Sequence, residues 1–331
     1  MIRTFGHLPN GREVQEITLK KGALEADVLT YGGIIRDLRF DGQSVVLGYS
    51  ELEPYLTEPG YVGAIIGRCA NRISEGRCLV DCQTVQLDIN ESGTTHLHGG
   101  MTGFSKRTWA IEQHDKASVL FKLVSEDGDQ GYPGRLETLL RYTLTGSGAL
   151  RVKITATTDK ATPVNLTQHS YFNLNQSPSV LRHRLEVAAD SYLPVDARKI
   201  PTGEVRKVAW TPFDFQENRV IATGGRAGEL LDHTFCLSSQ KRSEPVFAAA
   251  LESPDEDTRM EVWTTEPGLH IYDAAGLSGT SPGLAGEAYG PHAGLCLETQ
   301  GWPDAPNHAN FPNVLLQSGE TYHHITEFRF S

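Results

Sequence analysis

Apolar and polar residues alternate with a period of two in most of the patterned segments of this chain. The alternation is clearest at residues 150–156, where the sequence reads LRVKITA. Because successive side chains of a β-strand point to opposite faces of a sheet, this pattern predicts a strand with one buried face. The same period predicts strands at residues 119–123, 140–144, 185–189 and 322–330. Helical spacing is almost absent, and a short helical turn is a candidate at residues 228–232.

Clusters of Gly, Asp, Ser and Pro separate these segments. They occur at residues 126–134, 222–228 and 276–286, and such clusters are typical of turns between strands. Many short strands with this punctuation predict an all-β fold, a large antiparallel β-sandwich. The chain has 331 residues, and no internal repeat, charge run or low-complexity linker divides it. We therefore expect a single domain over residues 1–331.

The amino-acid composition limits the kinds of molecule that this protein is expected to bind. The formal net charge is −11 without a local concentration of Lys and Arg, which disfavours nucleic acid and acidic membrane surfaces and favours a neutral small molecule. Hydrophobic residues make up 39% of the chain, with no apolar run long enough to cross a bilayer. The first residues, MIRTFGHLPNGREVQEITL, lack the pattern of a secretory signal. We expect a cytoplasmic protein that is a monomer or a homodimer.

The cysteines argue against a disulfide framework and against a zinc ribbon. Their number, five, is odd, and the sequence contains no C-x-x-C pair. A free Cys in a cytoplasmic protein commonly behaves as a small buried hydrophobe. We therefore expect buried free thiols at Cys69, Cys78, Cys82, Cys236 and Cys296.

Five segments are richer in polar groups than their surroundings. They are GRCANRI (67–73), THLHGG (95–100), QHSYFNL (168–174), LDHTF (231–235) and ETQGWPDAPNHANFP (298–312). Together they supply Asn, Arg, His, Asp and Glu. These side chains can hydrogen-bond hydroxyl groups from several directions and can move protons between two oxygens.

The same five segments, in this order, resemble those of the aldose 1-epimerases, also called galactose mutarotases. The similarity runs from about Gly63 to Pro312 and includes GFSKRTW (103–109), GYPG (131–134) and DSYLPVDARKIPTGEV (190–205). The resemblance implies a β-supersandwich with an active site on its concave face. It also implies interconversion of the α and β anomers of a free aldose such as galactose or glucose, without metal or cofactor.

The resemblance assigns roles to individual residues. It places the catalytic base at Glu298 and the catalytic acid at His169. The sugar-binding groups that it implies are Asn71, Arg72, His98 and Asp232. An acid at neutral pH must be substantially protonated, and we expect a neighbouring carboxylate, Glu298 or Asp232, to favour the His169 cation.

Two positions depart from the family pattern. Members commonly have a glutamine where this chain has His270, and we expect this histidine to contact the sugar. The segment ESGTT (91–95) has threonines where an asparagine is usual. Neither change touches the proton-transfer pair, so both bear on the preferred sugar rather than on the reaction.

Three alternatives stay open at this point. His96 and His98 form an H-x-H whose side chains would share one face of a strand and could bind a metal, but a third ligand is missing nearby, and the role of His96 is undecided. A non-catalytic sugar-binding module would keep a polar groove but lack an acid and a base. A glycosidase or lyase would need two carboxylates, such as Glu298 with Asp232 or Asp304.

Overall fold

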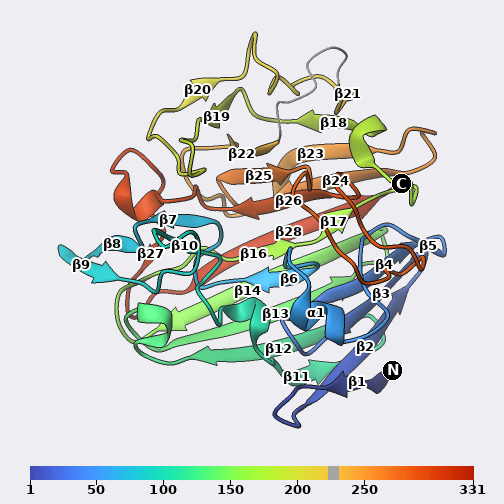
Figure 1. Ribbon diagram of the computed structural model, residues 1–331, viewed down its shortest axis with the longest axis horizontal. Coiled ribbons are helices and arrows are strands. Elements are labelled where there is room, and N and C mark those ends of the chain that lie inside the picture. The colour runs from blue at the N-terminus through green and yellow to red at the C-terminus, as the bar shows by residue number, and fades with distance from the viewer. Residues whose placement is uncertain (223–230) are drawn as a thin grey trace.

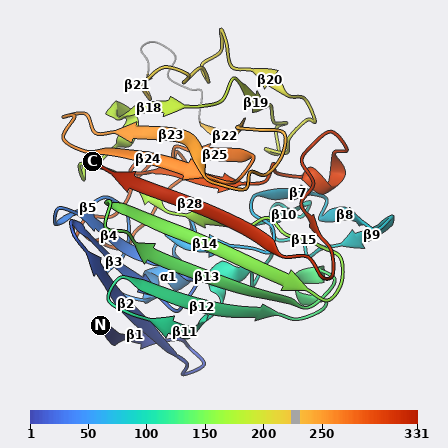
Figure 2. The same ribbon diagram turned by 180° about the vertical axis from the view of Figure 1, so that it is seen from behind.

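The computed structural model describes residues 1–222 and 231–331, and β-strands dominate these residues (Figure 1). A long antiparallel sheet covers one face of the molecule, as Figure 2 shows from behind. Its strand order is β11 (Ala110–His114), β12 (Ser118–Ser125), β13 (Leu136–Leu144), β14 (Ala149–Thr158), β28 (Tyr322–Phe330), β24 (Arg259–Thr264), β23 (Val246–Glu252), β18 (Arg184–Val187) and β21 (Arg219–Val220). The end of the chain, β28, thus pairs with strands from its middle.

A second antiparallel sheet lies on the other side of the molecule (Figure 1). Its strand order is β17 (Tyr171–Phe172), β26 (Leu295–Gln300), β25 (Gly268–Tyr272), β22 (Asp232–Cys236), β19 (Ser191–Leu193) and β20 (Arg206–Lys207). A short pair, β6 (Ala64–Ile66) and β16 (Thr167–His169), continues this layer because β16 packs beside β26.

The N-terminal strands form a sheet of their own. It contains β1 (Ile2–His7), β2 (Glu13–Lys21), β3 (Leu24–Leu29), β4 (Ile35–Phe40) and β5 (Gln43–Ser44) in chain order. The remaining paired strands are β7 (Arg72–Ser74) with β10 (Thr95–Leu97), β8 (Arg77–Val80) with β9 (Gln83–Gln86), and β15 (Thr162–Pro163) with β27 (Leu315–Leu316). The helical segments described are α1 (Glu53–Thr57) and the 3-10 turns η1 (Phe104–Lys106), η2 (Asp129–Gly131), η3 (Val180–Arg182) and η4 (Ala305–Asn307).

The main hydrophobic core is built from the alternating positions that the sequence predicts. Along β13, buried and partly exposed residues alternate over the whole strand. Leu140 of β13, Phe121 of β12 and Ile154 of β14 are completely buried, and full burial of one such side chain contributes roughly 1.5–3 kcal/mol. The hydroxyl of Tyr142 lies in the same core and donates a hydrogen bond of 2.6 Å to the carbonyl oxygen of Gly33, so its polar group is satisfied.

The predicted antiparallel all-β fold is confirmed. The strands expected from the alternation are present as β12, β13, β14, β18 and β28. Of the candidate helical turn at residues 228–232, residues 228–230 lie outside the described residues, and Asp232 begins strand β22. Among the helices in the described ranges, none is long and apolar enough to cross a membrane.

The cysteines lie in the described ranges and are all free thiols. The expectation that they are buried holds for Cys69, Cys78 and Cys296, whereas Cys236 is partly exposed and Cys82 is exposed. Cys82 and Asp81 form the two-residue connection between β8 and β9, and both have left-handed φ angles, 64° and 47°. Tight hairpin turns of this kind project their central side chains into solvent.

Candidate active site

His169 and Glu298 come together where β16 packs beside β26. His169 ends β16, and Glu298 lies in the interior of β26, whose residues are all buried. The Nε2 atom of His169 is 3.6 Å from Oε1 of Glu298. The other carboxylate oxygen, Oε2, is buried and has no hydrogen-bond partner among the residues that the structure describes. A buried acceptor of this kind is costly unless a ligand satisfies it.

Burial shifts both groups toward their neutral forms. Burial, reinforced by the negative charge of Asp232, raises the pKa of Glu298 well above the ordinary value of a carboxyl group. Burial lowers the pKa of His169 to about 4 and outweighs the opposite effect of Asp232. The expected stabilisation of the His169 cation by neighbouring carboxylates therefore does not prevail in the free protein. Since the two shifts have opposite directions, the pair holds one proton over a wide pH range.

Two hydrogen bonds connect Asn71 and His98, one to the His98 ring and one between the two backbones. The Asn71 N–H donates to Nδ1 of His98 at 3.1 Å, and the His98 N–H donates to the Asn71 carbonyl at 3.0 Å. Because Nδ1 accepts, the proton of the neutral ring is on Nε2, which is free to donate into the pocket. Burial and the nearby His169 lower the pKa of His98 well below its usual value, so this ring is neutral.

Steric crowding explains why a glycine directly follows His98. Gly99 has a φ of 83°, and a Cβ at this position would lie 1.7 Å from the carbonyl oxygen of Gly67. Only glycine allows this close approach of the two backbones. The THLHGG and GRCANRI segments are thereby packed together, which places His98 beside Asn71.

Arg72 is held by a carboxylate that the sequence analysis did not single out. Its Nε and Nη2 atoms both donate to Glu91, each at 2.7 Å. This two-pronged pairing fixes the plane of the guanidinium group. Glu91 begins the segment ESGTT, while Thr95 of that segment pairs with Ser74 between β10 and β7. The segment ESGTT, which departs from the family pattern, therefore affects the site because its first residue, Glu91, positions Arg72.

Asp232 and His270 are neighbours on β22 and β25. Nε2 of His270 is 3.0 Å from Oδ1 of Asp232, and its Nδ1 is 3.0 Å from the hydroxyl of Thr234. Both ring nitrogens are therefore engaged by protein groups. Burial opposes ionisation of Asp232, but the hydrogen bonds and charges of His270 and Lys199 outweigh it and lower the pKa of this carboxyl far below its usual value.

These side chains surround one pocket of about 190 Å³. It is lined by all the residues predicted from the sequence, namely His169, Glu298, Asn71, Arg72, His98, Asp232 and His270. Tyr61, Lys199 and Tyr272 also line it and were not predicted from the sequence. The ring of Tyr61 packs 4.7 Å from that of His98 and 6.1 Å from that of His169, measured between centroids. The pocket thus combines a buried histidine–carboxyl pair, several hydrogen-bonding groups and an aromatic wall.

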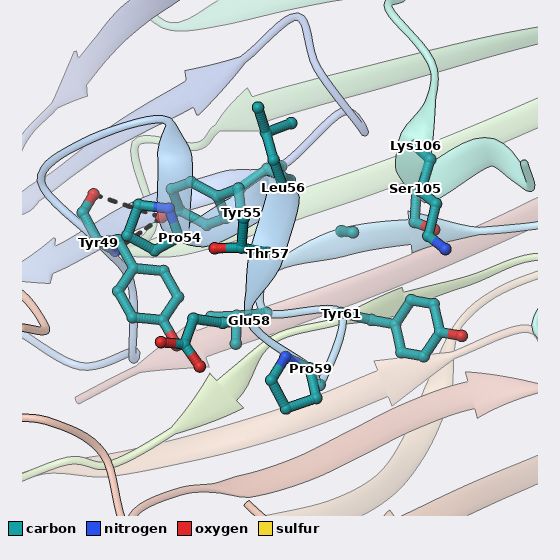
Figure 3. Close-up of a pocket in the computed structure, with 14 residues that line it drawn as sticks. Tyr49, Pro54, Tyr55, Leu56, Thr57, Glu58, Pro59, Tyr61, Ser105 and Lys106 are labelled. Carbon is teal, nitrogen blue, oxygen red and sulfur yellow. Dashed lines mark hydrogen bonds between the residues drawn. The ribbon is translucent and has the colours of Figure 1, made fainter. Parts of the chain in front are cut away.

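Tyr61 also borders a second cavity of about 340 Å³, which is shown in Figure 3. That cavity lies next to α1 and contains Glu58 and Lys106 at its wall. The Oε1 atom of Glu58 already accepts hydrogen bonds from the hydroxyls of Thr280 and Ser281, at 2.9 and 2.7 Å. Because the proton-transfer pair faces the smaller pocket, the smaller pocket is the candidate active site.

The H-x-H alternative depends on a strand geometry that the structure does not have. β10 ends at Leu97, and His98 has a left-handed φ of 50°, so His96 and His98 do not share a strand face. His96 is completely buried, with Nδ1 2.7 Å from the Asp88 carbonyl oxygen and Nε2 2.6 Å from the Tyr132 hydroxyl. Its two nitrogens are used in the core, which gives His96 a structural role.

Another set of possible metal ligands occurs in the pocket wall. Donor atoms of His169, Cys296 and Glu298 all lie within 4.8 Å of one another. The sulfur of Cys296 faces Nδ1 of His169 at 3.6 Å, whereas Glu298 faces Nε2. An imidazole nitrogen offers one lone pair to one ion, and here the two partners lie at different nitrogens. The arrangement is therefore a chain of hydrogen-bonding groups rather than a set of ligands around one centre.

Asp304, the other carboxylate considered for hydrolysis, is turned toward the backbone. Its Oδ1 accepts from the Ser74 N–H at 3.0 Å, and its Oδ2 is 3.2 Å from Nε2 of His308. Its own N–H donates to the Arg72 carbonyl at 3.1 Å. Asp304 thereby braces the strand that carries Arg72 and does not face the pocket as a second catalytic carboxylate.

The chain matches the family model described as Aldose 1-epimerase over residues 15–329. It is 42% identical over 337 residues to galactose mutarotase of Rattus norvegicus, covering 99% of this chain and 97% of the rat protein. Aldose 1-epimerase of Escherichia coli (strain K12) is 38% identical over 337 residues, covering 97% and 96%. The solved structure of the aldose epimerase homologue from C. elegans has a TM-score of 0.89 at 30% identity, covering 96% of this chain and 98% of that one. The predicted mutarotase-like fold is thus confirmed, and the chain belongs to the aldose 1-epimerase family.

Proposed function

We propose that this protein is an aldose 1-epimerase that interconverts the α and β anomers of free aldoses such as galactose and glucose, with residues 1–331 acting as one domain. The observation that carries this proposal is the buried pair of His169 and Glu298, 3.6 Å apart, at the wall of a pocket rich in hydrogen-bonding groups. Family membership supports the same reaction.

Anomerisation needs two coupled proton transfers. The anomeric hydroxyl loses its proton while the ring oxygen gains one, and the C1–O5 bond breaks to give an open-chain aldehyde. Rotation about C1–C2 and reclosure form the other anomer. A pair that holds one proton suits this reaction, since one member acts as acid while the other acts as base, and closure reverses the roles.

In our proposal Glu298 takes the proton of the anomeric hydroxyl and His169 protonates the ring oxygen. In the free site, burial favours the proton on Glu298. A sugar hydroxyl that donates to Glu298 stabilises the carboxylate form, and the proton then moves to His169. The net charge of the pair does not change in this transfer, so no further charge has to be buried.

The other lining groups orient the sugar. Arg72, held in place by Glu91, donates to a hydroxyl or to the charge that develops on the ring oxygen. The Nε2–H of His98 donates to a hydroxyl, and Asn71 adds a polar contact. Asp232 accepts from a hydroxyl, while His270, engaged on both nitrogens, positions Asp232.

The geometry of the site does not support the two alternative functions, a non-catalytic sugar-binding module and a glycosidase. A binding module has no need for a buried acid and base in contact with its ligand pocket. A glycosidase requires a second carboxylate facing the scissile bond. Asp304 is used in bracing β7, and we assign Asp232, which is held by His270 and Lys199, to sugar binding.

Polarimetry of freshly dissolved α-D-glucose and α-D-galactose tests the proposal. We expect the protein to accelerate the approach to the equilibrium rotation of both sugars above the rate in buffer. The control is protein inactivated by heat, in the same buffer and at the same pH. No acceleration with any common aldose would contradict the proposed activity.

A further inference from the structure

Lys199 is a cation in the pocket wall that no feature of the reaction requires. It lies in the connection between β19 and β20 and has a left-handed φ of 63°. Asp196 fixes this turn, since its side chain accepts from the N–H groups of Arg198 and Ile200 at 2.8 and 3.0 Å, and its carbonyl accepts from the Lys199 N–H at 2.9 Å. The turn therefore holds the Lys199 backbone in the conformation that directs its side chain to the pocket.

The ammonium group of Lys199 contacts Oδ2 of Asp232. The other oxygen of Asp232 is held by His270, which is held in turn by Thr234. Asp232 therefore has a fixed orientation and keeps a second partner when Lys199 is absent. An ammonium group has three N–H donors, so Lys199 can donate to a ligand without leaving Asp232.

We propose that Lys199 and Asp232 together recognise two adjacent hydroxyls of the aldose, so that Lys199 is a specificity-determining residue. This inference rests on the proposed function. Asp232 accepts a hydrogen bond from one hydroxyl, and Lys199 donates to the oxygen of its neighbour. Neighbouring hydroxyl oxygens on a pyranose are about one hydrogen-bond length apart, which matches a donor and an acceptor in direct contact.

The sheet order indicates which hydroxyls these are. Glu298 is on β26 and Asp232 is on β22, with β25 between them. Two strand spacings correspond to about 10 Å between the backbones. With C1 held at Glu298, the pair reaches the far side of the ring, where C3 and C4 lie. C2 adjoins the reacting carbon, and we expect the pair to lie closer to the hydroxyls of C3 and C4 than to that of C2.

The side-chain exposures agree with this role. The side chain of Lys199 is 47% exposed and that of Asp232 is 13% exposed. Asp232 is largely buried, but it keeps His270 as a partner when Lys199 is replaced, and the half-exposed Lys199 side chain itself adds little to stability. Replacing Lys199 is thus expected to leave the fold intact, and an effect on the sugar can be measured separately.

The experiment measures the kinetics of each enzyme variant with each of several deoxy sugars. Wild type, Lys199→Met and Lys199→Arg are assayed with D-glucose and with its 2-deoxy, 3-deoxy and 4-deoxy analogues. We expect Lys199→Met to raise KM for glucose about tenfold, the scale of one lost hydrogen bond to a charged group, with little change in kcat. The same KM ratio should persist with the 2-deoxy sugar and vanish with the 3-deoxy or the 4-deoxy sugar. Lys199→Arg should restore part of the loss.

Lys207→Met is the matched control, because Lys207 of β20 pairs with Asp190 and lies outside the pocket wall. It should leave KM unchanged for every sugar. An unchanged KM for glucose in Lys199→Met would overturn the inference, and so would an equal KM ratio for all four sugars, which would indicate a general disturbance of the site. In either case the wild-type protein would still accelerate mutarotation. Failure of the proposed function is distinct, since the wild type would then accelerate none of them.

Discussion

The backbone N–H of Asn71 donates a hydrogen bond of 3.1 Å to Nδ1 of His98. This bond sets the tautomer of the ring, because a neutral imidazole that accepts at Nδ1 carries its proton on Nε2. His98 thus uses one nitrogen for the protein, and in our proposal the other donates to the sugar. Two substitutions separate these tasks.

His98→Asn can place its side-chain oxygen near Nδ1 and keep the bond from Asn71, but it offers nothing at the position of Nε2. We expect KM to rise about tenfold, the effect of losing one hydrogen bond, with a near-normal denaturation midpoint. His98→Gln reaches toward Nε2 but leaves the Asn71 N–H unpaired, which should cost about 1–3 kcal/mol of stability. Kinetics and urea unfolding of both variants check this, and the same pattern in both would contradict the division of tasks.

Removal of either member of the proton-transfer pair should abolish most of the activity. We expect Glu298→Gln and His169→Asn each to lower kcat by at least about 10²-fold, because each deletes a general acid or base. Gln matches Glu298 in size and Asn is a smaller polar substitute for His169, so circular dichroism should verify that each variant keeps the fold. Near-normal turnover in either variant would show that the residue has been assigned wrongly.

The pH profile of kcat/KM should have a broad plateau. The active free enzyme holds one proton in the pair. The pKa of His169, lowered to about 4 by burial, means that a second proton binds only near that pH and removes the base below it. The raised pKa of Glu298 extends the range in which the single proton stays bound beyond that of an ordinary carboxyl group.

We therefore expect an acid limb near pH 4 and a plateau that includes pH 7, measured after subtraction of the buffer rate at each pH. If the histidine had an ordinary pKa of about 6.5, and its cation were required in the free enzyme, kcat/KM would fall above that pH. A decline of this kind between pH 6 and pH 7 would contradict the one-proton pair.

Residual activity after chelation tests the absence of a metal from the reaction. Cys296 and Glu298 contact different nitrogens of His169, and the proposed proton transfers need no Lewis acid. We expect full activity after exhaustive dialysis against EDTA. Loss of activity that added zinc restores would show that a metal takes part, and would require another account of these three residues.

The strand pattern and the site motifs could be predicted because their signals are local. Residues of β13 alternate on a scale of two positions. The five polar segments contain all the predicted lining residues except His270, which was singled out as a departure from the family pattern. The geometry of His98 could not be predicted in this way. A continuing strand was assumed at His96 and His98, but the chain leaves β10 at Leu97 with a left-handed turn.

Residues that act through distant partners were also missed. Glu91 meets Arg72 across 19 positions of sequence, and Lys199 meets Asp232 across 33. Neither contact produces a periodic pattern in the sequence. The available hints were modest: Glu91 stands in the unusual segment ESGTT, and Lys199 follows an Asp that is typical of a side-chain-stabilised turn. The pKa of His169 was likewise misjudged, because the depth of burial depends on how β16 packs beside β26.

One ion pair outside the site, between a completely buried carboxylate and a partly exposed lysine, should matter for stability. Glu266 is completely buried, and its Oε1 lies 2.8 Å from Nζ of Lys241. The same ammonium group lies 3.6 Å from the centre of the Tyr322 ring. Breaking a buried pair leaves an uncompensated charge, which typically costs 3–5 kcal/mol.

We expect Lys241→Met to lower the free energy of unfolding by about 3 kcal/mol, since the methionine keeps the apolar contact with Tyr322 but removes the charge that compensates Glu266. Lys207→Met serves as the comparison, because its pair with Asp190 is 70% and 63% exposed, and such pairs contribute little. Urea unfolding of both variants at neutral pH measures the difference. Equal stability of the two would contradict the compensating role of Lys241. The double variant Lys241→Met/Glu266→Gln, which removes the buried charge as well, should then recover no stability over Lys241→Met.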